Sequence, residues 1–490
     1  MDELLILAVA LPILGATLTT ALPRWALAVG LLAALVTSAT GLAVTAAVWW
    51  QGPLHLAVGG WEAPLGVALR ADGLTAALLA MINLVALGIS IYASGYFRAS
   101  GKLVHFWPLW LLLWASLNGA FMSADLFNIY VTLEVMGLSA ASLGALGGSR
   151  AAVVANLRYL LVGLLGSMTY LLGVALVYTA YGTLELHLLA ERITAGPQGA
   201  AALVLVTAGL ALKAALFPLH FWLPPAHSAA PAPVSAALSA LVVKAAFYLI
   251  LRLWLGPFAA VTTTSAAVVL GLLGAGGVVW GSWRALRAER LKLLAAYSTV
   301  AQVGYLFLFL PMLAVTPAGP GRASLTAGLA LMALSHGFAK AGLFLAAGQL
   351  QQYAGHDRIN DLGPAAREHP ASTFAVALAG VALVGLPPSG TFFGKWLLIS
   401  NAFATGQWWW VVVVLLGTLL AASYTFRVLS RAFSTERVPR QAPTDLRTEL
   451  PALVLTATAV VLLLFLARPL WTLLGLDADA ALPGLAGGWR

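Results

Sequence analysis

Fourteen apolar stretches, each about twenty residues long, follow one another along this chain of 490 residues. A helical run of that length spans the hydrocarbon core of a bilayer, because each residue adds about 1.5 Å. Hydrophobic residues make up 61% of the sequence and charged residues 9%, whereas soluble domains carry about 25% charged residues. The sequence therefore predicts an all-α, polytopic membrane protein with about fourteen transmembrane helices.

The loops between these stretches predict the orientation. The expected helix cores are residues 3–22, 25–49, 73–95, 106–123, 125–146, 153–179, 199–217, 233–254, 263–282, 291–312, 323–349, 371–401, 408–430 and 450–467. Loops after odd-numbered cores hold 14 Lys and Arg, and the remaining loops and termini hold 6. Because basic residues favour the cytoplasmic side, both termini are expected outside a prokaryotic cytoplasmic membrane. The first core follows Asp2 and Glu3 without a basic region, so we expect an uncleaved span.

Composition also limits the chemistry. The net charge of +9 comes from arginines placed in loops, which indicates membrane topology rather than nucleic-acid binding. The chain contains no cysteine, which excludes disulfides, thiolate metal sites and cysteine-ligated iron–sulfur clusters. No flavin, quinone or haem motif is visible, so we expect no cofactor and no redox chemistry of its own. Any electron carrier would belong to another chain.

Two expected helices contain proline breaks. The seventh ends around Phe217-Pro218, and the twelfth carries Pro387-Pro388 near its midpoint. Proline opens a helix, and in lipid the freed carbonyls are tolerated only where protein or water satisfies them. Interrupted helices five spans apart indicate an inverted-repeat transporter core, here spans 4–8 and 9–13. The repeat is imperfect, since Lys213 precedes its break and Lys395 follows its own.

We expect one transmembrane domain with four parts. These parts are 1–100 with spans 1–3, 101–256 with the first repeat, 257–433 with the second repeat, and 434–490 with a connector and span 14. Residues 183–194 are too short and too charged to span, so we expect them to lie flat at the outer interface. Residues 434–449 are the most polar stretch and are expected to form a cytoplasmic connector.

Ionisable residues occur inside the expected helices, where each is costly and therefore a candidate functional group. Glu134 lies mid-span, either as a neutral acid bonded to a carbonyl or as the partner of Lys213. Lys244 has nothing acidic near it in sequence, so it either reaches an interface or exchanges protons. These three residues begin a candidate line of proton-carrying groups.

The second half of the chain continues this line. His336 and Lys340 are four residues apart and share a helix face, so His336 is a relay element or a packing residue. Lys395 follows the second break by about two turns, as the end of a relay or as an anchor of the broken helix.

The residues near the first break leave several readings open. His220 and His227 flank it, either as packing and hydrogen-bonding residues or, for His227, as a point of proton uptake. Without further ligands nearby we expect no metal site. Asp125 precedes the fifth span as a helix cap or as part of an ion path.

These motifs resemble those of the antiporter-like subunits shared by Mrp-type cation/proton antiporters, respiratory complex I and membrane-bound hydrogenases. The matching segments are ADLFNIYVTLE (124–134), ALKAALFPLHFWLPPAH (211–227), APVSAALSALVVK (232–244), LLAAYSTVAQVGY (293–305), SHGFAKAGLFLAAG (335–348) and GLPPSGTFFGKW (385–396). The resemblance implies fourteen helices in two inverted five-helix repeats, with a proton path along the membrane midplane.

The resemblance also implies a role for each buried ionisable residue. Glu134 and Lys213 would form a charge-coupled pair, and Lys244 would be the central relay. His336 and Lys340 would continue the line to Lys395 as the terminal group.

The same resemblance narrows the parent complex and the partners. The segments DLFNIYVTLEVM and 156–178 are most similar to the D-type subunit of Mrp antiporters, whereas the elbow LPPAHSAAPAPVSA is similar to complex I and hydrogenase versions. We expect a proton-translocating subunit of a Mrp-type Na⁺(K⁺)/H⁺ antiporter, or alternatively the pumping module of a complex I-like or hydrogenase-type redox complex. Its partners would be other membrane subunits, lipid, protons, and Na⁺ or K⁺.

Overall fold

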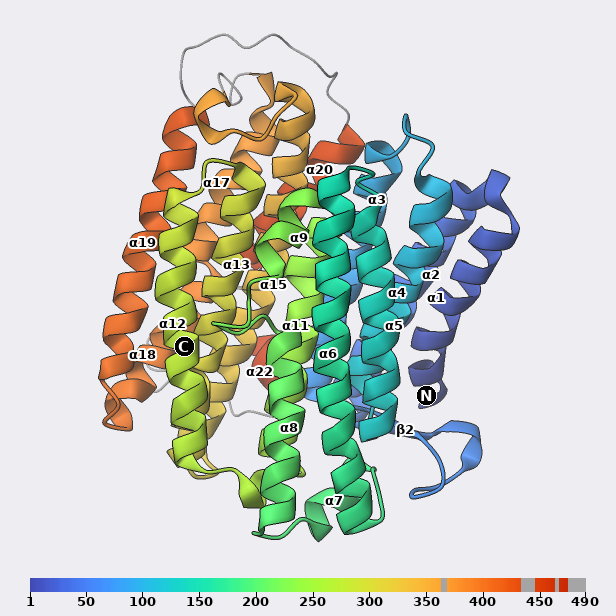
Figure 1. Ribbon diagram of the computed structural model, residues 1–490, viewed down its shortest axis with the longest axis vertical. Coiled ribbons are helices and arrows are strands. Elements are labelled where there is room, and N and C mark those ends of the chain that lie inside the picture. The colour runs from blue at the N-terminus through green and yellow to red at the C-terminus, as the bar shows by residue number, and fades with distance from the viewer. Residues whose placement is uncertain (363–367, 433–445, 463–466, 475–490) are drawn as a thin grey trace. The chain divides into compact units, whose positions relative to one another are not determined.

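The computed structural model describes residues 1–362, 368–432, 446–462 and 467–474 (Figure 1). Most of them are helical, and the chain divides into two compact units. The first unit comprises Met1–Ser90, Phe97–Val234 and Leu241–Thr263. The second comprises Ile91–Tyr96, Ser235–Ala240 and Thr264–Arg490.

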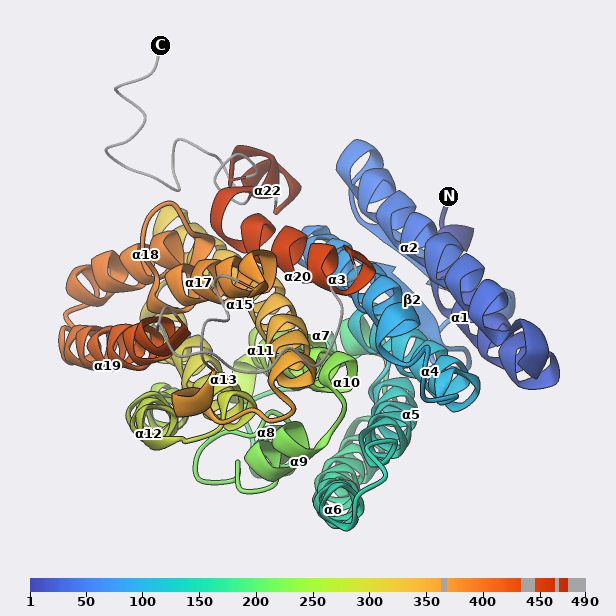
Figure 2. The same cartoon turned by 90° about the horizontal axis from the view of Figure 1, so that it is seen from above.

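The first unit begins with two apolar helices that lie side by side (Figure 2). Its elements in chain order are α1 (Glu3–Ala21), η1 (Pro23–Trp25), α2 (Ala26–Gln51), β1 (Leu54–Ala57), η2 (Val58–Gly60), β2 (Ala68–Ala71), α3 (Gly73–Tyr96), α4 (Leu103–Met122), α5 (Leu126–Ala145), α6 (Arg150–Tyr181), α7 (Leu186–Arg192), α8 (Pro197–Lys213), α9 (Leu223–Ala229) and, towards its end, α11 (Val243–Leu255) and η4 (Ala259–Val261). The end of α3 belongs to the second unit. Between α9 and α11 lie α10 (Ala232–Ala237) and the π-helical turn η3 (Leu238–Val242), so that Ala232–Leu255 is one apolar helix.

The named elements of the second unit, over its described residues, are all helices. Its elements are α12 (Thr264–Arg287), α13 (Leu291–Phe307), α14 (Phe309–Val315), α15 (Pro320–Ala354), η5 (Ile359–Asp361), α17 (Pro370–Val384), α18 (Gly390–Ala404), α19 (Trp409–Ala432), α20 (Leu446–Ala457), η6 (Thr458–Leu462) and α22 (Ala467–Leu473). Helix α15 packs against α17, α18 and α20, and its residues 324–350 are buried throughout apart from Thr326.

The expected helix cores fall mainly on helices wherever the structure describes them. The core expected at 73–95 is Gly73–Tyr96, and the core expected at 233–254 is Ala232–Leu255. Ten described helices are long and apolar enough to cross a membrane, and Pro197–Lys213 and Pro370–Val384 are shorter apolar helices. The prediction of a polytopic α-helical membrane protein is confirmed at this level.

Three connections differ from the helical core. Residues 54–71 contain an antiparallel hairpin, β1–β2, that we did not expect from the sequence. The segment 183–194 forms the short helix α7, which lies across the ends of α6 and α8 in Figure 1. The connector expected at 434–449 lies outside the described residues except for its last four, which begin α20.

Both proline breaks are present, one in each unit. Helix α8 ends at Lys213, and the chain turns through Ala215, whose φ of 54° lies in the left-handed region that side chains disfavour. In the second unit α17 ends at Val384, where Gly385 adopts a φ of 79°, and Ser389 caps the start of α18 through the Phe392 N–H. The peptide bonds Phe217-Pro218 and Pro387-Pro388 are cis.

Glycines bring neighbouring helices into backbone contact. A Cβ added to Gly209 on α8 would lie 2.4 Å from the Gly166 carbonyl oxygen of α6, and a Cβ on Gly304 of α13 would lie 2.4 Å from the Gly274 carbonyl oxygen of α12. Small residues let membrane helices approach in this way, since lipid provides no hydrophobic drive for association. Each unit therefore contains a tightly packed helix pair as well as a break.

Candidate functional site: buried ionisable groups

The first unit brings Glu134 and Lys213 together. Glu134 projects from α5 and Lys213 is the last residue of α8, and their Oε1 and Nζ atoms are 4.0 Å apart. Their side chains are 19% and 8% exposed, and Glu134 Oε1 has no hydrogen bond within the described residues. The ammonium also lies at the carbonyl end of a helix, which favours positive charge. The two groups are therefore close enough to interact electrostatically.

The break after α8 is held by aromatic packing. The indole N–H of Trp222 donates to the Leu212 carbonyl at 3.0 Å, and Tyr159 stacks on the Trp222 ring at 4.7 Å. Thus one carbonyl freed by the end of α8 finds a partner, as lipid-buried backbone requires. His220 stacks on Phe217, while His227 is fully buried in α9.

Lys244 lies near the start of α11 with only 2% of its surface exposed, so its amine does not reach the protein surface. Tyr248 and Arg252 follow at intervals of four residues, on the same face of α11. This face therefore carries polar groups along two helical turns, from a buried lysine to a partly exposed arginine.

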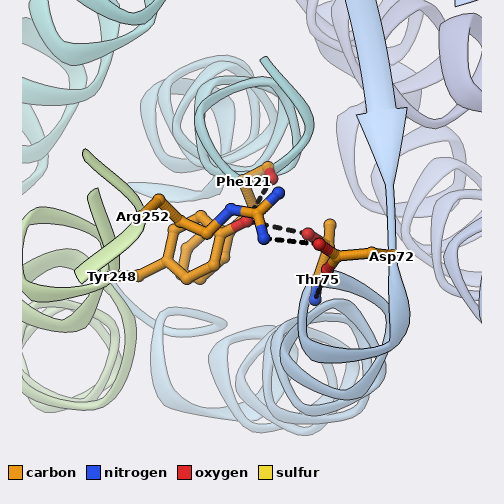
Figure 3. A network of polar contacts seen from close by, with 5 residues as sticks. All are labelled: Asp72, Thr75, Phe121, Tyr248 and Arg252. Atoms are coloured by element: carbon orange, nitrogen blue, oxygen red, sulfur yellow. Dashed lines mark hydrogen bonds and ion pairs between the residues drawn. The ribbon is translucent and has the colours of Figure 1, made fainter. Parts of the chain in front are cut away.

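Tyr248 and Arg252, the two residues of this face that follow Lys244, belong to a polar network that was not predicted from the sequence (Figure 3). The Arg252 guanidinium pairs with Asp72, which is also the N-terminal cap of α3 and accepts from the Thr75 N–H at 3.0 Å. The Tyr248 hydroxyl contacts the Thr75 hydroxyl at 2.7 Å and donates to the Phe121 carbonyl at 3.0 Å. Burial raises the pKa of Asp72, but Arg252 and the Thr75 N–H together hold that pKa below its usual value. The network ties α11 to α3 and α4.

Asp125 acts as a helix cap, one of its two expected roles. Its carboxylate accepts from the Phe127 and Asn128 N–H groups, both at 2.8 Å. Burial raises the pKa of Asp125 above its usual value, because the two backbone donors only partly offset burial and the nearby Glu185 adds repulsion.

In the second unit His336 and Lys340 are fully buried on α15, one turn apart. The Lys340 amine donates to the Ala295 carbonyl at 2.8 Å and to the Ser298 hydroxyl, both on α13. Lys340 is thus bound by a helix carbonyl and a hydroxyl.

Lys395 projects from α18 back to the break that precedes it. Its amine donates to the Val384 carbonyl and to the Thr418 hydroxyl, each at 2.9 Å, and lies 4.5 Å from the centre of the Tyr305 ring. Val384 is the last residue of α17, so Lys395 anchors the broken helix. A relay role and an anchoring role are compatible in this geometry.

Two further charged sites were not predicted from the sequence. Lys292, counted among loop residues, lies in the first turn of α13 and is 3% exposed. Close by, Arg290 pairs with the buried Asp357 at 2.8 Å.

The second of these sites is Arg427 on α19, which donates to the carbonyls of Leu286 and Ala288 at the end of α12. Spacing along the chain carries no signal for these contacts, since the partners are far apart in sequence.

No group of three or more His, Cys, Asp or Glu side chains suited to a metal occurs within the described residues. The buried ionisable side chains of the two units include Lys213, Lys244, Lys340 and Lys395, together with His227 and His336.

Comparison with known proteins identifies the family. Residues 123–421 match the family described as NADH:quinone oxidoreductase/Mrp antiporter, TM, and this segment contains both breaks and the buried lysines described above. The chain belongs to this family. The resemblance inferred from the sequence motifs is confirmed.

Relatives of this antiporter-like family align over most of the chain. The N-type subunit of the NADH-quinone oxidoreductase of Desulforudis audaxviator is 36% identical over 447 residues, which cover 88% of this chain and 87% of the relative. The D-type subunit of the Na⁺/H⁺ antiporter of Alkalihalophilus pseudofirmus is 28% identical over 424 residues, which cover 85% and 84%. A chain of the membrane-bound sulfane sulfur reductase, an archaeal respiratory membrane complex, superposes with a TM-score of 0.88 at 26% identity and covers 98% of both chains.

Proposed function

We propose that this chain is a proton-translocating, antiporter-like subunit of a multi-subunit membrane complex. The observation that carries the proposal is the buried Glu134–Lys213 pair, 4.0 Å apart at the end of a broken helix. Burying two charges is costly, so a pair of this kind is weak evidence for a stabilising role and stronger evidence for a functional one.

In the proposed mechanism a proton that arrives on Glu134 cancels the negative charge facing Lys213. At about 4 Å and an effective dielectric constant of about 20, that change alters the energy of the ammonium by about 4 kcal/mol. Lys213 then releases its proton through water towards Lys244. Each transfer neutralises one amine and charges the next, so the charge change advances along the line of groups.

The later carriers are His336, Lys340 and Lys395, with Lys395 as the terminal group and His227 at a point of proton uptake. The hydrogen bonds that hold Lys340 and Lys395 end on carbonyls and hydroxyls. Such acceptors bind an ammonium without fixing its proton as a carboxylate would, which suits groups that are charged and discharged in turn.

The topology that accompanies this mechanism is also proposed. Fourteen spans would form two inverted five-helix repeats, 101–256 and 257–433, after an N-terminal part, 1–100, and before a connector and last span, 434–490. Both termini would face the outside of the cytoplasmic membrane.

Two parent complexes fit this role. The motifs of the fifth and sixth helices favour a Mrp-type Na⁺(K⁺)/H⁺ antiporter, in which inward proton flow drives cation efflux. The identity of 36% to an N-type subunit, against 28% to a D-type subunit, favours a redox-driven complex that pumps protons outward. Purification of the complex and identification of its other subunits separates the two.

The mechanism is tested by replacing either member of the pair in the assembled complex. We expect Glu134→Ala or Lys213→Ala to abolish pH-gradient formation in proteoliposomes while assembly is retained, because the first transfer needs both charges. Glu191→Ala, which removes an exposed carboxylate of α7, is the matched control and should transport normally. Gradient formation at the wild-type rate by either assembled pair variant would refute the relay.

A further inference from the structure

The surroundings of Lys395 differ in kind from those of Lys213. Three groups surround its amine: the Val384 carbonyl, the Thr418 hydroxyl and the face of the Tyr305 ring. Within the described residues no carboxylate lies at ion-pair distance from this amine. Lys395 is nevertheless 5% exposed, so it is as buried as a lysine that has a counter-ion.

Each of these three groups favours a cation. The Val384 carbonyl belongs to the last residue of α17 and lies at the negative end of the helix. The negative face of an aromatic ring attracts an ammonium within about 6 Å, and the attraction is strongest away from water. The neutral amine gains nothing comparable from a ring. Tyr305 therefore distinguishes the charged form of Lys395 from the neutral form.

The structure holds Tyr305 in this place from two sides. Its hydroxyl donates to the Val414 carbonyl of α19 at 3.4 Å, the same carbonyl that accepts from Thr418 at 2.8 Å. Gly417 leaves room for the ring, because a Cβ there would lie 2.3 Å from the Tyr305 hydroxyl oxygen. At Gly385 an added Cβ would lie 3.0 Å from Lys395 Cδ. The ring and the amine thus meet in a space that two glycines keep open.

We infer that Tyr305 is a positioning residue that holds Lys395 in its ammonium form at the second helix break, in place of a carboxylate. The inference rests on the proposed function, in which Lys395 carries protons. Among the described residues, the titratable group that faces the Lys395 amine is Tyr305, and Tyr424 in turn interacts with Tyr305; both are phenols. Among the described residues, the charge on Lys395 is therefore balanced by the Val384 carbonyl, the Thr418 hydroxyl and the Tyr305 ring.

The test compares pH profiles of proton transport by the reconstituted complex. Tyr305→Phe keeps the ring and should keep the wild-type profile. Tyr305→Leu removes the ring, so the Lys395 ammonium loses its proton at a lower pH. The alkaline limb of the profile, where transport falls as the pH rises, should therefore move down by about one pH unit. At a pH above this limb, transport should be reduced about tenfold. Equal profiles for Tyr305→Leu and wild type would overturn the inference, as would loss of transport in both Tyr305 variants.

Two further variants separate the ring from packing. Gly417→Ala keeps the tyrosine but pushes it from its place, so it should move the alkaline limb in the same direction as Tyr305→Leu. Tyr170→Leu removes a buried tyrosine of the first unit whose hydroxyl donates to the Leu126 carbonyl and whose ring contacts no lysine or arginine among the described residues. It is the matched control and should leave the limb unmoved; an equal shift there would assign the effect to packing and refute the inference.

A separate variant distinguishes failure of this inference from failure of the proposed function. If Lys395→Gln transports like the wild type, Lys395 carries no proton and the relay itself is wrong. If Lys395→Gln is inactive while Tyr305→Leu is unchanged, the relay stands and only the role of the ring is wrong.

Discussion

Two aspartates at helix starts show how one residue type acquires opposite properties in this protein. Asp72 caps α3 and Asp125 caps α5, and both accept backbone N–H groups. Asp72 faces the Arg252 guanidinium, which helps to hold its pKa below the usual value of 3.8, whereas burial, with a smaller contribution from Glu185, raises the pKa of Asp125. The sequence left two roles open for Asp125, a helix cap or part of an ion path, and the structure shows the cap. The contact between Asp72 and Arg252 joins residues 180 positions apart, so no local motif predicts it.

This contrast gives a prediction for stability. Asp72→Asn keeps the cap and removes the ion pair, so at pH 7 we expect a loss of about 1 kcal/mol, measured by thermal denaturation of the purified complex. Because the folded pKa of Asp72 is lowered, its contribution to stability is complete above the unfolded value of 3.8 and is lost as the pH falls through the folded value. Asp125→Asn is the control and should cost nothing at pH 7; equal losses in both variants would contradict the prediction.

At the scale of elements, the helices were predictable and their contacts were not. Apolar runs located the helices because a bilayer demands about twenty such residues, and prolines located both breaks because they cannot continue a helix. These two rules do not predict three other features: the hairpin β1–β2, the π-helical turn η3, and the binding of Arg427 to the end of α12. Each depends on which segments meet in three dimensions.

Helix contacts made by glycine supply a prediction at this scale. Gly209→Ala places a methyl group 2.4 Å from the Gly166 carbonyl oxygen, so α6 and α8 must separate. We expect a destabilisation of about 1–3 kcal/mol, as for an overpacked core, together with weaker transport because Lys213 ends α8. Gly163→Ala on α6 meets nothing within 4 Å and should be tolerated. The measurement is the thermal stability of each variant in the purified complex. Equal stability of Gly209→Ala and Gly163→Ala would argue against close packing of α6 and α8 at Gly209.

For the whole molecule, the family relation explains why so much could be read from the sequence alone. Motifs near the breaks are dense enough to identify the antiporter-like family, and similarity extends over about nine-tenths of the chain. The same motifs do not choose the parent complex, because relatives from an NADH-quinone oxidoreductase and from a Na⁺/H⁺ antiporter both align over most of the chain.

The proposed orientation is testable because the chain contains no cysteine. Single cysteines at Asp2 and at Gly488 should react with a membrane-impermeant maleimide added to intact cells, since both termini are expected outside. Ser100→Cys, in an exposed turn after the third helix, is expected inside and should react only after the cells are opened. The opposite pattern would invert the topology, and a mixed pattern at the termini would change the parity of the span count.

The two breaks place a lysine ammonium at the same kind of position by different routes. Lys213 is itself the final residue of α8, whereas Lys395 belongs to the following helix and reaches back to the final carbonyl of α17. In the proposed two-repeat topology, the halves would thus supply a lysine to their breaks from different sequence positions. An alignment of the halves, position by position, would score these two lysines as unrelated although each ends at the last turn of a broken helix.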